Sequence, residues 1–437
     1  MTGPLRLPAV LVTSRHAASV YPWQTCQTLP SDGVPICINH LAGGAAFSYD
    51  PWDCYAAGTI TSPNMVVLGQ LGVGKSALVK TYLHRQLAAG RQVFILDPKG
   101  EYAPLAKAAG LAIVRLVPGG SERLNPLDPP PGPAEPARLV ASRTRIVAAL
   151  AGGQLGRELA AEERAAIAAA VDTLTQADAQ DELGHPPTHP TQGGGPGCPT
   201  VPVLSDVVDL LLEPTAMMAT TLRTTPAALA AAARPAALEL HRLLAGDLAG
   251  LVDGPSTARL DPDGPGIVVD LSAAQGTDAL TPVMVCAGGW LAAALDRPSA
   301  RKRLLLVDEA WALLGAPATT RWLQSVSKLA RAHGAQLITV VHRLSDLTGQ
   351  ADAGTATAAQ AGGLLADAET RVVYRQAAAE HDTGIRLLGL TSTEAALVGR
   401  LPAHRALWLI GRHAAVVDHI LADDERCLID TDARMRP

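Results

Sequence analysis

The chain has 437 residues, and its 41 Asp and Glu side chains slightly outnumber its 36 Lys and Arg. This length accommodates two or three domains, and a hydrophobic share of 48% supplies an ordinary buried core. A net charge of -5 excludes a global positive field of the kind that gives nonspecific affinity for nucleic acid, so any contact with DNA must be local.

The first part of the chain, residues 1–63, is rich in turn formers. Two short pieces within it, 34–38 and 45–49, have the apolar and aromatic character of strands. We expect this part to form an arm packed on the edge of the domain that follows.

Strands and helices alternate over residues 64–128. An apolar run at 65–68 predicts a strand, 75–89 predicts a helix, and 93–96 predicts a second strand. Strands that alternate with helices favour a parallel sheet of βαβ units, and apolar strands without polar alternation indicate burial on both faces. The sequence therefore predicts the first half of an α/β domain.

A complete phosphate-binding loop, G-x-x-x-x-G-K-S, lies between the first strand and the first helix, at 69–76. Its glycines let backbone N–H groups turn toward phosphates at the positive end of a helix, while Lys75 reaches the β- and γ-phosphates and Ser76 ligates Mg²⁺. We therefore expect ATP and Mg²⁺ as cofactors. The predicted nucleotide-binding residues are Gly69, Gly72, Val73, Gly74, Lys75, Ser76 and Ala77.

The composition of the chain changes at about residue 129, where a proline-rich stretch leads into segments with helical patterns. Residues 129–262 are therefore predicted to form an all-helical insertion between two halves of one α/β domain. Ser205 is a plausible N-cap within it, and Pro226 and Pro235 are expected to interrupt its last helix. The predicted helices are 137–151, 158–177, 205–213 and 226–250.

A run of Pro and Gly residues near 184–200 predicts a mobile loop inside the insertion. His185 and His189 lie in this loop, but a metal site is disfavoured because no third ligand is near them in the sequence.

Predicted strands and helices alternate again over residues 263–437, which we expect to form the second half of the α/β domain. They are a strand at 266–270, a helix at 280–295 and a strand at 303–307. The last of these strands runs into Asp308 and Glu309. This is the Walker B arrangement, in which the first acid holds Mg²⁺ and the second polarises the attacking water. We therefore expect Asp308 as a metal ligand and Glu309 as a catalytic residue.

A further predicted strand at 336–341 ends in His342. A polar residue at the carboxyl end of a strand beside the P-loop lies where the γ-phosphate and its water are bound, so His342 is a candidate sensor of that water. One of the arginines of this half could serve as a trans-acting finger in phosphoryl transfer. The arginines considered are Arg331, Arg343, Arg371, Arg375 and Arg405.

The sequence offers little support for a membrane span or a disulfide framework. The most apolar stretch, 283–295, is shorter than the ~20 residues that cross a bilayer and is better interpreted as a buried helix. The six cysteines lack C-x-x-C spacing, so a reducing cytoplasm is the simplest setting. Any membrane association is expected to come through a partner.

Together with the P-loop, three strings resemble one family: Asp-Pro-Lys-Gly-Glu-Tyr at 97–102, Leu-Asn-Pro-Leu-Asp at 124–128 and Val-Asp-Glu-Ala-Trp at 307–311. The family is the VirB/TraC-type ATPase of conjugation and type IV secretion, within the HerA-FtsK superfamily. Strings at 329–334 and 342–347 are most similar to the actinobacterial branch. The resemblance spans about residues 45 to 415.

The resemblance implies a RecA-like P-loop NTPase domain that assembles as a hexameric ring, with ATP at subunit boundaries, and that powers macromolecular transfer at the membrane. Lys75 and Ser76 would bind nucleotide and Mg²⁺, Asp308 and Glu309 would form Walker B, and Arg331 falls in a motif with a basic residue near the site. The wider family usually has glutamine where this chain has His342. Its larger members also carry a long N-terminal domain, so that docking here would need a separate membrane protein.

Three functions remain open from the sequence. The first is a cytoplasmic, peripherally membrane-associated ATPase motor of conjugation or type IV secretion, which transfers DNA or a protein-DNA conjugate. The second is a ring-shaped translocase of double-stranded DNA of the FtsK and HerA kind. The third is a nucleotide-gated structural subunit, which the intact set of Lys75, Ser76, Asp308 and Glu309 disfavours.

Overall fold

The computed structural model describes residues 33–129, 135–182, 201–342 and 362–429, apart from 247, 262, 296–298, 364 and 366. Several sequence predictions fall outside these ranges. They concern the first part of the N-terminal arm, the loop near 184–200 with His185 and His189, Arg343, and most of the string at 342–347.

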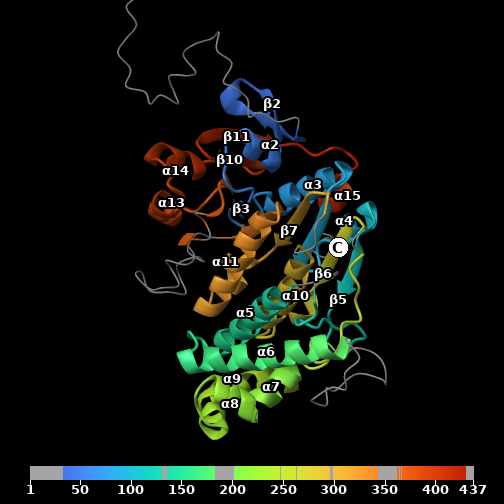
Figure 1. Ribbon diagram of the computed structural model, residues 1–437. Coiled ribbons are helices and arrows are strands. Elements are labelled where there is room, and N and C mark those ends of the chain that lie inside the picture. Colours follow the sequence, from blue (N-terminus) through green and yellow to red (C-terminus); the bar gives the residue numbers. More distant parts are fainter. Residues whose placement is uncertain are drawn as a thin grey trace, which may run out of the picture.

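An 11-stranded sheet runs through the middle of the molecule in the order β2-β1-β11-β10-β9-β3-β8-β7-β4-β6-β5 (Figure 1). The strands from β9 to β5 in this order are parallel, and those from β2 to β9 pair antiparallel. The predicted α/β class with a mostly parallel sheet is therefore confirmed. The strands are β1 (Val34–Asn39), β2 (Ala45–Tyr49), β3 (Met65–Leu68), β4 (Gln92–Asp97), β5 (Ala112–Arg115), β6 (Gly266–Asp270), β7 (Arg303–Val307), β8 (Gln336–Val341), β9 (Thr370–Val373), β10 (Arg405–Ile410) and β11 (His413–His419).

The central strands consist mainly of apolar residues, as expected where both faces of the sheet are covered. Successive side chains of a strand point to opposite faces, so Val66 and Leu68 of β3 join one core while Met65 and Val67 join the other. The first core contains buried residues of α10 and α11, and the second contains those of α3, α4 and α15. Each strand thus holds two layers of helices together.

The helices flank the sheet and form a separate layer at the lower end of Figure 1, where α6 to α9 gather. The α-helices are α2 (Pro51–Ala56), α3 (Lys75–Ala88), α4 (Ala103–Ala109), α5 (Pro136–Leu155), α6 (Ala161–Glu182), α7 (Leu204–Leu212), α8 (Ala216–Thr221), α9 (Pro226–Ala245), α10 (Leu280–Leu295), α11 (Pro317–Ala332), α13 (His381–Leu388), α14 (Ser392–Val398) and α15 (Arg426–Ile429). Short 3-10 turns are η1 (His40–Ala42), η2 (Ser272–Ala274), η3 (Ala310–Leu313) and η5 (Ala378–Glu380).

Two details of the predicted insertion helices are wrong. Helix α7 begins at Leu204, before Ser205, and its first turn is capped instead by the Asp206 carboxylate, which accepts a hydrogen bond from the Val203 N–H at 2.9 Å. Helix α9 continues through Pro235, because burial of apolar side chains on both sides of the proline holds the helix together. Pro226 occupies the first turn, where its missing N–H costs nothing.

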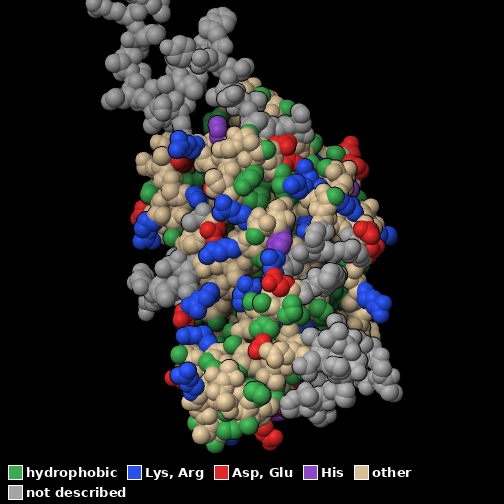
Figure 2. Space-filling model, in the orientation of Figure 1, with side chains coloured by type: hydrophobic (Ala, Val, Ile, Leu, Met, Phe, Trp, Pro, Cys, Tyr) green, Lys and Arg blue, Asp and Glu red, His purple; other side chains and the backbone are tan. Residues whose placement is uncertain are grey.

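Charged side chains of both signs are interspersed on the face that Figure 2 shows. Within the part of the chain that the structure describes, no helix combines the length and the apolar character needed to cross a bilayer.

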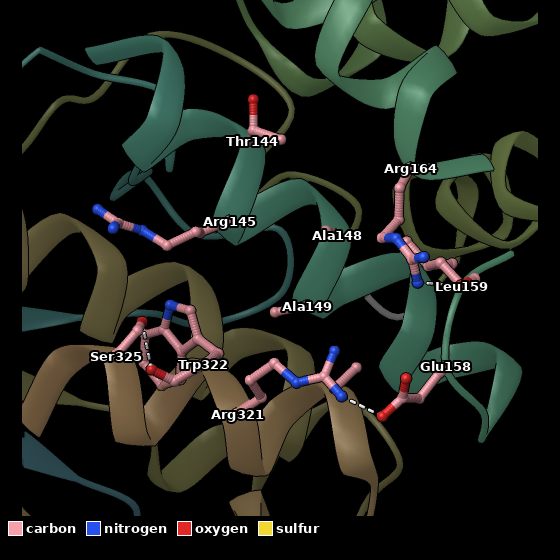
Figure 3. Close-up of a pocket in the computed structure, with 11 residues that line it drawn as sticks. Thr144, Arg145, Ala148, Ala149, Glu158, Leu159, Arg164, Arg321, Trp322 and Ser325 are labelled. Carbon is pink, nitrogen blue, oxygen red and sulfur yellow. Dashed lines mark hydrogen bonds and ion pairs between the residues drawn. The ribbon is translucent and has the colours of Figure 1, made fainter. Parts of the chain in front are cut away.

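Small residues allow the insertion to pack closely on the second α/β half. A Cβ on Gly289 of α10 would lie 2.6 Å from the Ile146 Cδ1 of α5, and a Cβ on Gly152 of α5 would lie 2.7 Å from the Ala318 Cβ of α11. Beside this seam is a cavity of about 360 Å³, whose lining residues come from α5, α11, α6 and the turn before α6 and are shown in Figure 3. Arg321 pairs with Glu158 at its edge. None of the predicted site residues lines this cavity.

Candidate nucleotide-binding and catalytic site

Four neighbouring parallel strands, β3, β8, β7 and β4, end at one edge of the sheet. The P-loop follows β3, His342 follows β8, and Asp308 and Glu309 follow β7. Polar groups at the carboxyl ends of parallel strands meet at such an edge, which is where α/β proteins bind ligands. The structure thus brings the predicted P-loop, Walker B and sensor residues to the same edge.

The P-loop turns sharply between β3 and α3. Gly72 and Gly74 adopt left-handed backbone conformations, with φ of 74° and 109°, which residues with a Cβ rarely adopt. Gly74 is the N-cap of α3, so the predicted ligands Lys75, Ser76 and Ala77 lie in its first turn. The Lys75 ammonium donates to the loop carbonyls of Gly69 and Gln70. The lysine therefore lies across its own loop, over the phosphate-binding turn.

Neighbouring loops support the P-loop from behind. The His404 N–H donates to the Val73 carbonyl at 2.8 Å, and the Gln70 N–H donates to the Arg375 carbonyl at 3.1 Å. A Cβ on Gly74 would lie 2.9 Å from the His404 Nδ1. His404 itself is in the left-handed region, with φ of 63°. Sequence reasoning missed His404, which lies over 300 residues from the loop and belongs to none of the quoted motifs.

The Asp97 carboxylate organises the Asp-Pro-Lys-Gly-Glu-Tyr turn at the end of β4. Its Oδ1 accepts hydrogen bonds from the N–H groups of Lys99, Gly100 and Glu101 at 2.8 to 3.2 Å. Its Oδ2 accepts from the Tyr102 N–H at 2.9 Å. Burial raises the pKa of Asp97 to about 6, even though these hydrogen bonds favour the charged form. The turn presents Lys99 and Tyr102 to the Walker B residues.

Asp308 is buried and held from two sides. The Tyr102 hydroxyl donates to its Oδ2 at 3.0 Å, and the Glu309 N–H donates to its Oδ1 at 2.9 Å. Burial, together with the negative charge of Glu309, raises the pKa of Asp308. A bound cation would relieve this unfavourable burial of negative charge. The oxygen ligands of Asp308 and Ser76 therefore suit Mg²⁺, which prefers carboxylates, water and substrate phosphates.

The Glu309 carboxylate lies at the centre of a hydrogen-bonded cluster. The Nε2 of His342 is 2.6 Å from its Oε1, the Lys99 ammonium contacts the same oxygen, and the Trp311 Nε1–H donates to Oε2. Burial alone would raise the pKa of Glu309, but the hydrogen bonds from His342 and Lys99 lower it to about 2. The sequence predicts His342 near the water at the γ-phosphate, and the structure brings it to the Glu309 carboxylate.

Lys80 adds a buried cation to the same edge. Its side chain is 1% exposed, and its Nζ lies 3.6 Å from Glu101 Oε2 and 5.4 Å from the Tyr102 ring centre. Burial lowers the pKa of Lys80, while the negative charges of Glu101, Asp97 and Asp308 oppose this change. Lys99 and Tyr102 belong to the string quoted for the resemblance, but sequence reasoning assigned them no role.

The structure places Arg331 away from this site in its own chain. The residue is exposed near the end of α11, which leads into the amino end of β8. β8 is six residues long, so roughly 20 Å of strand, at about 3.3 Å per residue, separates this end from His342. Arg331 therefore lies far from the P-loop of its own subunit, because a βαβ crossover returns its helix to the opposite edge of the sheet. Its role as a trans-acting finger stays a prediction.

Two other arginines have different partners. Arg371 donates to the carbonyls of Ala368 and Leu388, and Arg405 pairs with Asp418. Arg375 is exposed and follows β9 directly beside the P-loop. Among the described residues, no cluster of three or more His, Cys, Asp or Glu side chains forms a metal cage.

Comparisons with known proteins agree with this geometry. The family model of the helicase HerA central domain matches residues 59–184. No curated protein sequence matches the chain. Among solved structures, VirB4 of Thermoanaerobacter pseudethanolicus superimposes with a TM-score of 0.67 and 21% identity, over 90% of this chain and 98% of that chain.

Two structures of a conjugative coupling protein are also similar. TrwBdeltaN70 superimposes with a TM-score of 0.57 and 14% identity, over 94% of this chain and 92% of that chain. Plasmid coupling protein TrwB in complex with ADP and Mg²⁺ superimposes with a TM-score of 0.54 and 16% identity, over 82% of this chain and 86% of that chain. The predicted RecA-like fold is confirmed: the chain has the fold of VirB4 and TrwB, and its residues 59–184 match the model of the helicase HerA central domain.

Proposed function

We propose that this protein is a Mg²⁺-dependent ATP-hydrolysing motor that powers conjugative DNA transfer or type IV-like secretion at the membrane. The observation that carries the proposal is the meeting of the P-loop, Asp308, Glu309 and His342 at one sheet edge. The similarity to a coupling protein that binds ADP and Mg²⁺ supports the choice of cofactors.

Each residue of the edge has a distinct task in this proposal. The P-loop amides and Lys75 bind the β- and γ-phosphates, and Ser76 and Asp308 hold the metal. Bound Mg²⁺ neutralises charge on the phosphate oxygens. Glu309 orients the attacking water and accepts its proton, and His342 fixes the position of the Glu309 carboxylate.

We further propose a homo-oligomeric, ring-shaped assembly of six subunits, in the cytoplasm and attached to the membrane through embedded transfer components. In such a ring an arginine of one subunit reaches the nucleotide of the next. Arg331 is exposed and distant from its own P-loop, which suits a trans-acting finger.

ATP hydrolysis by the purified protein tests the catalytic part of this proposal. We expect Mg²⁺-dependent phosphate release that EDTA abolishes, and a loss of about 100-fold or more in kcat for Glu309→Gln, since a general base contributes 10²–10⁴-fold. Lys75→Ala should weaken nucleotide binding itself, because the ammonium is the side-chain cation of the loop. Glu162→Gln, the same change on the exposed surface of α6, is the control. Binding of ATP without measurable phosphate release would instead indicate a nucleotide-gated structural subunit.

A translocase of double-stranded DNA is the second candidate function. The match to the central domain of a helicase favours it. The net charge of -5 requires that its DNA contacts be local, for example in the pore of a ring.

A further inference from the structure

Both carboxylate oxygens of Glu309 are engaged by side chains of its own subunit. Oε1 is shared by Lys99 and by His342, whose Nε2 is 2.6 Å away, and Oε2 accepts the Trp311 indole N–H. The Glu309 side chain is only 6% exposed. A general base needs a free lone pair directed at the water that it deprotonates, and here both oxygens already accept hydrogen bonds from side chains. In this arrangement Glu309 is a poor base.

The backbone holds Glu309 toward these partners. Glu309 has φ of 51°, in the left-handed region, which is costly for a residue with a Cβ. Its N–H is fixed by Asp308 Oδ1 at 2.9 Å, and η3 begins directly after it with Trp311 in the first turn. Non-glycine residues in this region persist only where the surrounding structure over-determines them, and they cluster at switch and active sites.

Lys99 is the partner that is best placed to leave. It lies on the turn that Asp97 organises, and its Nζ is also 3.5 Å from His342 Nε2. Its side chain is 23% exposed, against 6% for Glu309, so the ammonium lies on the open side of the cluster. A lysine stem has four rotatable bonds, and its ammonium can move to solvent or to another anion without a change in the fold.

We propose that Lys99 is a positioning residue that restrains Glu309 in a resting arrangement, so that the isolated protein hydrolyses ATP below the rate its site allows until Lys99 moves aside. The inference rests on the proposed function, since it takes Glu309 as the catalytic base. Trp311 contributes to the same restraint through the second oxygen. His342 stays with Glu309 in both arrangements and keeps the carboxylate oriented.

Steady-state ATP hydrolysis by the full chain tests the restraint. In Lys99→Met, which keeps the length of the stem and removes the charge, we expect kcat to rise about tenfold, because one charge-assisted hydrogen bond to the base is lost. KM for ATP should stay within about twofold, since Lys99 contacts the base and not the P-loop. Trp311→Phe keeps an aromatic ring without the N–H and should raise kcat by a smaller factor. Both results together would support the restraint.

The controls separate this inference from the proposed function. Lys99→Arg should retain the low rate of the unchanged protein, and so should Lys107→Met on the exposed surface of α4. Glu309→Gln should be inactive with or without Lys99→Met. A fall or no change in kcat for folded Lys99→Met, with Glu309→Gln inactive, would overturn the restraint and leave the ATPase intact. Activity of Glu309→Gln would overturn the proposed function. If Lys99→Met does not fold, the kcat of Trp311→Phe is the test of the restraint. An unchanged kcat in Trp311→Phe would contradict the restraint.

Discussion

Single side chains behind the P-loop connect the antiparallel part of the sheet to the nucleotide helix. His419, at the end of β11, lies with its Nε2 2.7 Å from the Thr81 hydroxyl of α3. Because that hydroxyl donates its own proton to the Ala77 carbonyl, the imidazole is the donor through Nε2. Burial lowers the pKa of His419 to about 4. The folded state therefore resists protonation of this residue.

This predicts a loss of stability on acidification. The unfolded imidazole takes up a proton near pH 6.5 and the folded one only near pH 4, so the contribution of His419 is complete above pH 6.5 and falls as the pH falls between these values. Urea unfolding at pH 7.5 and at pH 5 measures this loss of stability. His419→Gln removes this titrating group. Between pH 7.5 and pH 5 we expect the free energy of unfolding of the unchanged protein to fall by about 2 kcal/mol more than that of His419→Gln. Equal drops in the two proteins would refute the assignment.

Residue types at the site were largely predictable, whereas their contacts were not. The P-loop and the acid pair have fixed local spacing, so Lys75, Ser76, Asp308 and Glu309 could be named from the sequence. The ion pair of Lys99 with Glu309 joins residues about 210 positions apart through the neighbouring strands β4 and β7. Only the order of strands in the sheet decides such a contact.

Close pairing of β4 with β6 depends on a glycine. Gly266 begins β6 opposite Val93, and its φ is 136°. A Cβ at this position would lie 1.8 Å from the Val93 carbonyl oxygen, a backbone atom that cannot move without shifting the strand. β4 carries the Asp97 turn, so the same pairing also supports the sheet edge that holds the candidate site.

Gly266→Ala should therefore destabilise the protein by about 2 kcal/mol or more, since overpacking against the backbone adds to the strain of a left-handed φ. We expect a lower midpoint of thermal unfolding by circular dichroism. Gly399→Ala is the matched control, because the Cβ there would meet neighbours only at 3.7 and 3.8 Å, with φ of -61°. Equal midpoints for the two variants would show that β4 and β6 can separate at no cost.

Elements with strong local patterns were predicted with nearly correct bounds. The strands at 65–68, 266–270 and 303–307 and the helix at 280–295 are confirmed as β3, β6, β7 and α10. Errors occurred where tertiary packing overrode local preference, as in the continuous helix α9 through Pro235. The position of Arg331 at the far end of α11 could not be predicted, because a motif gives no information about which end of a crossover helix faces the site.

The whole molecule separates the two candidate functions through its response to DNA. A translocase that grips duplex DNA by its phosphates should show ATPase activity that DNA stimulates severalfold, and the stimulation should fall steeply as salt rises from 50 to 200 mM. A motor for protein transfer should hydrolyse ATP at a rate that DNA does not change. Phosphate release measured with and without linear duplex DNA, at both salt concentrations, distinguishes them, and Glu309→Gln corrects for contaminating ATPases.

The sequence by itself determined the nucleotide loop, the acid pair and the alternating α/β order, because each is specified by neighbouring residues along the chain. The tertiary structure decided the rest. It placed β8 between the P-loop strand and the Walker B strand, brought Lys99 and His342 to Glu309, and turned Arg331 to the far edge. These results depend on burial of both sheet faces over distant segments, and no local pattern encodes which strands become neighbours.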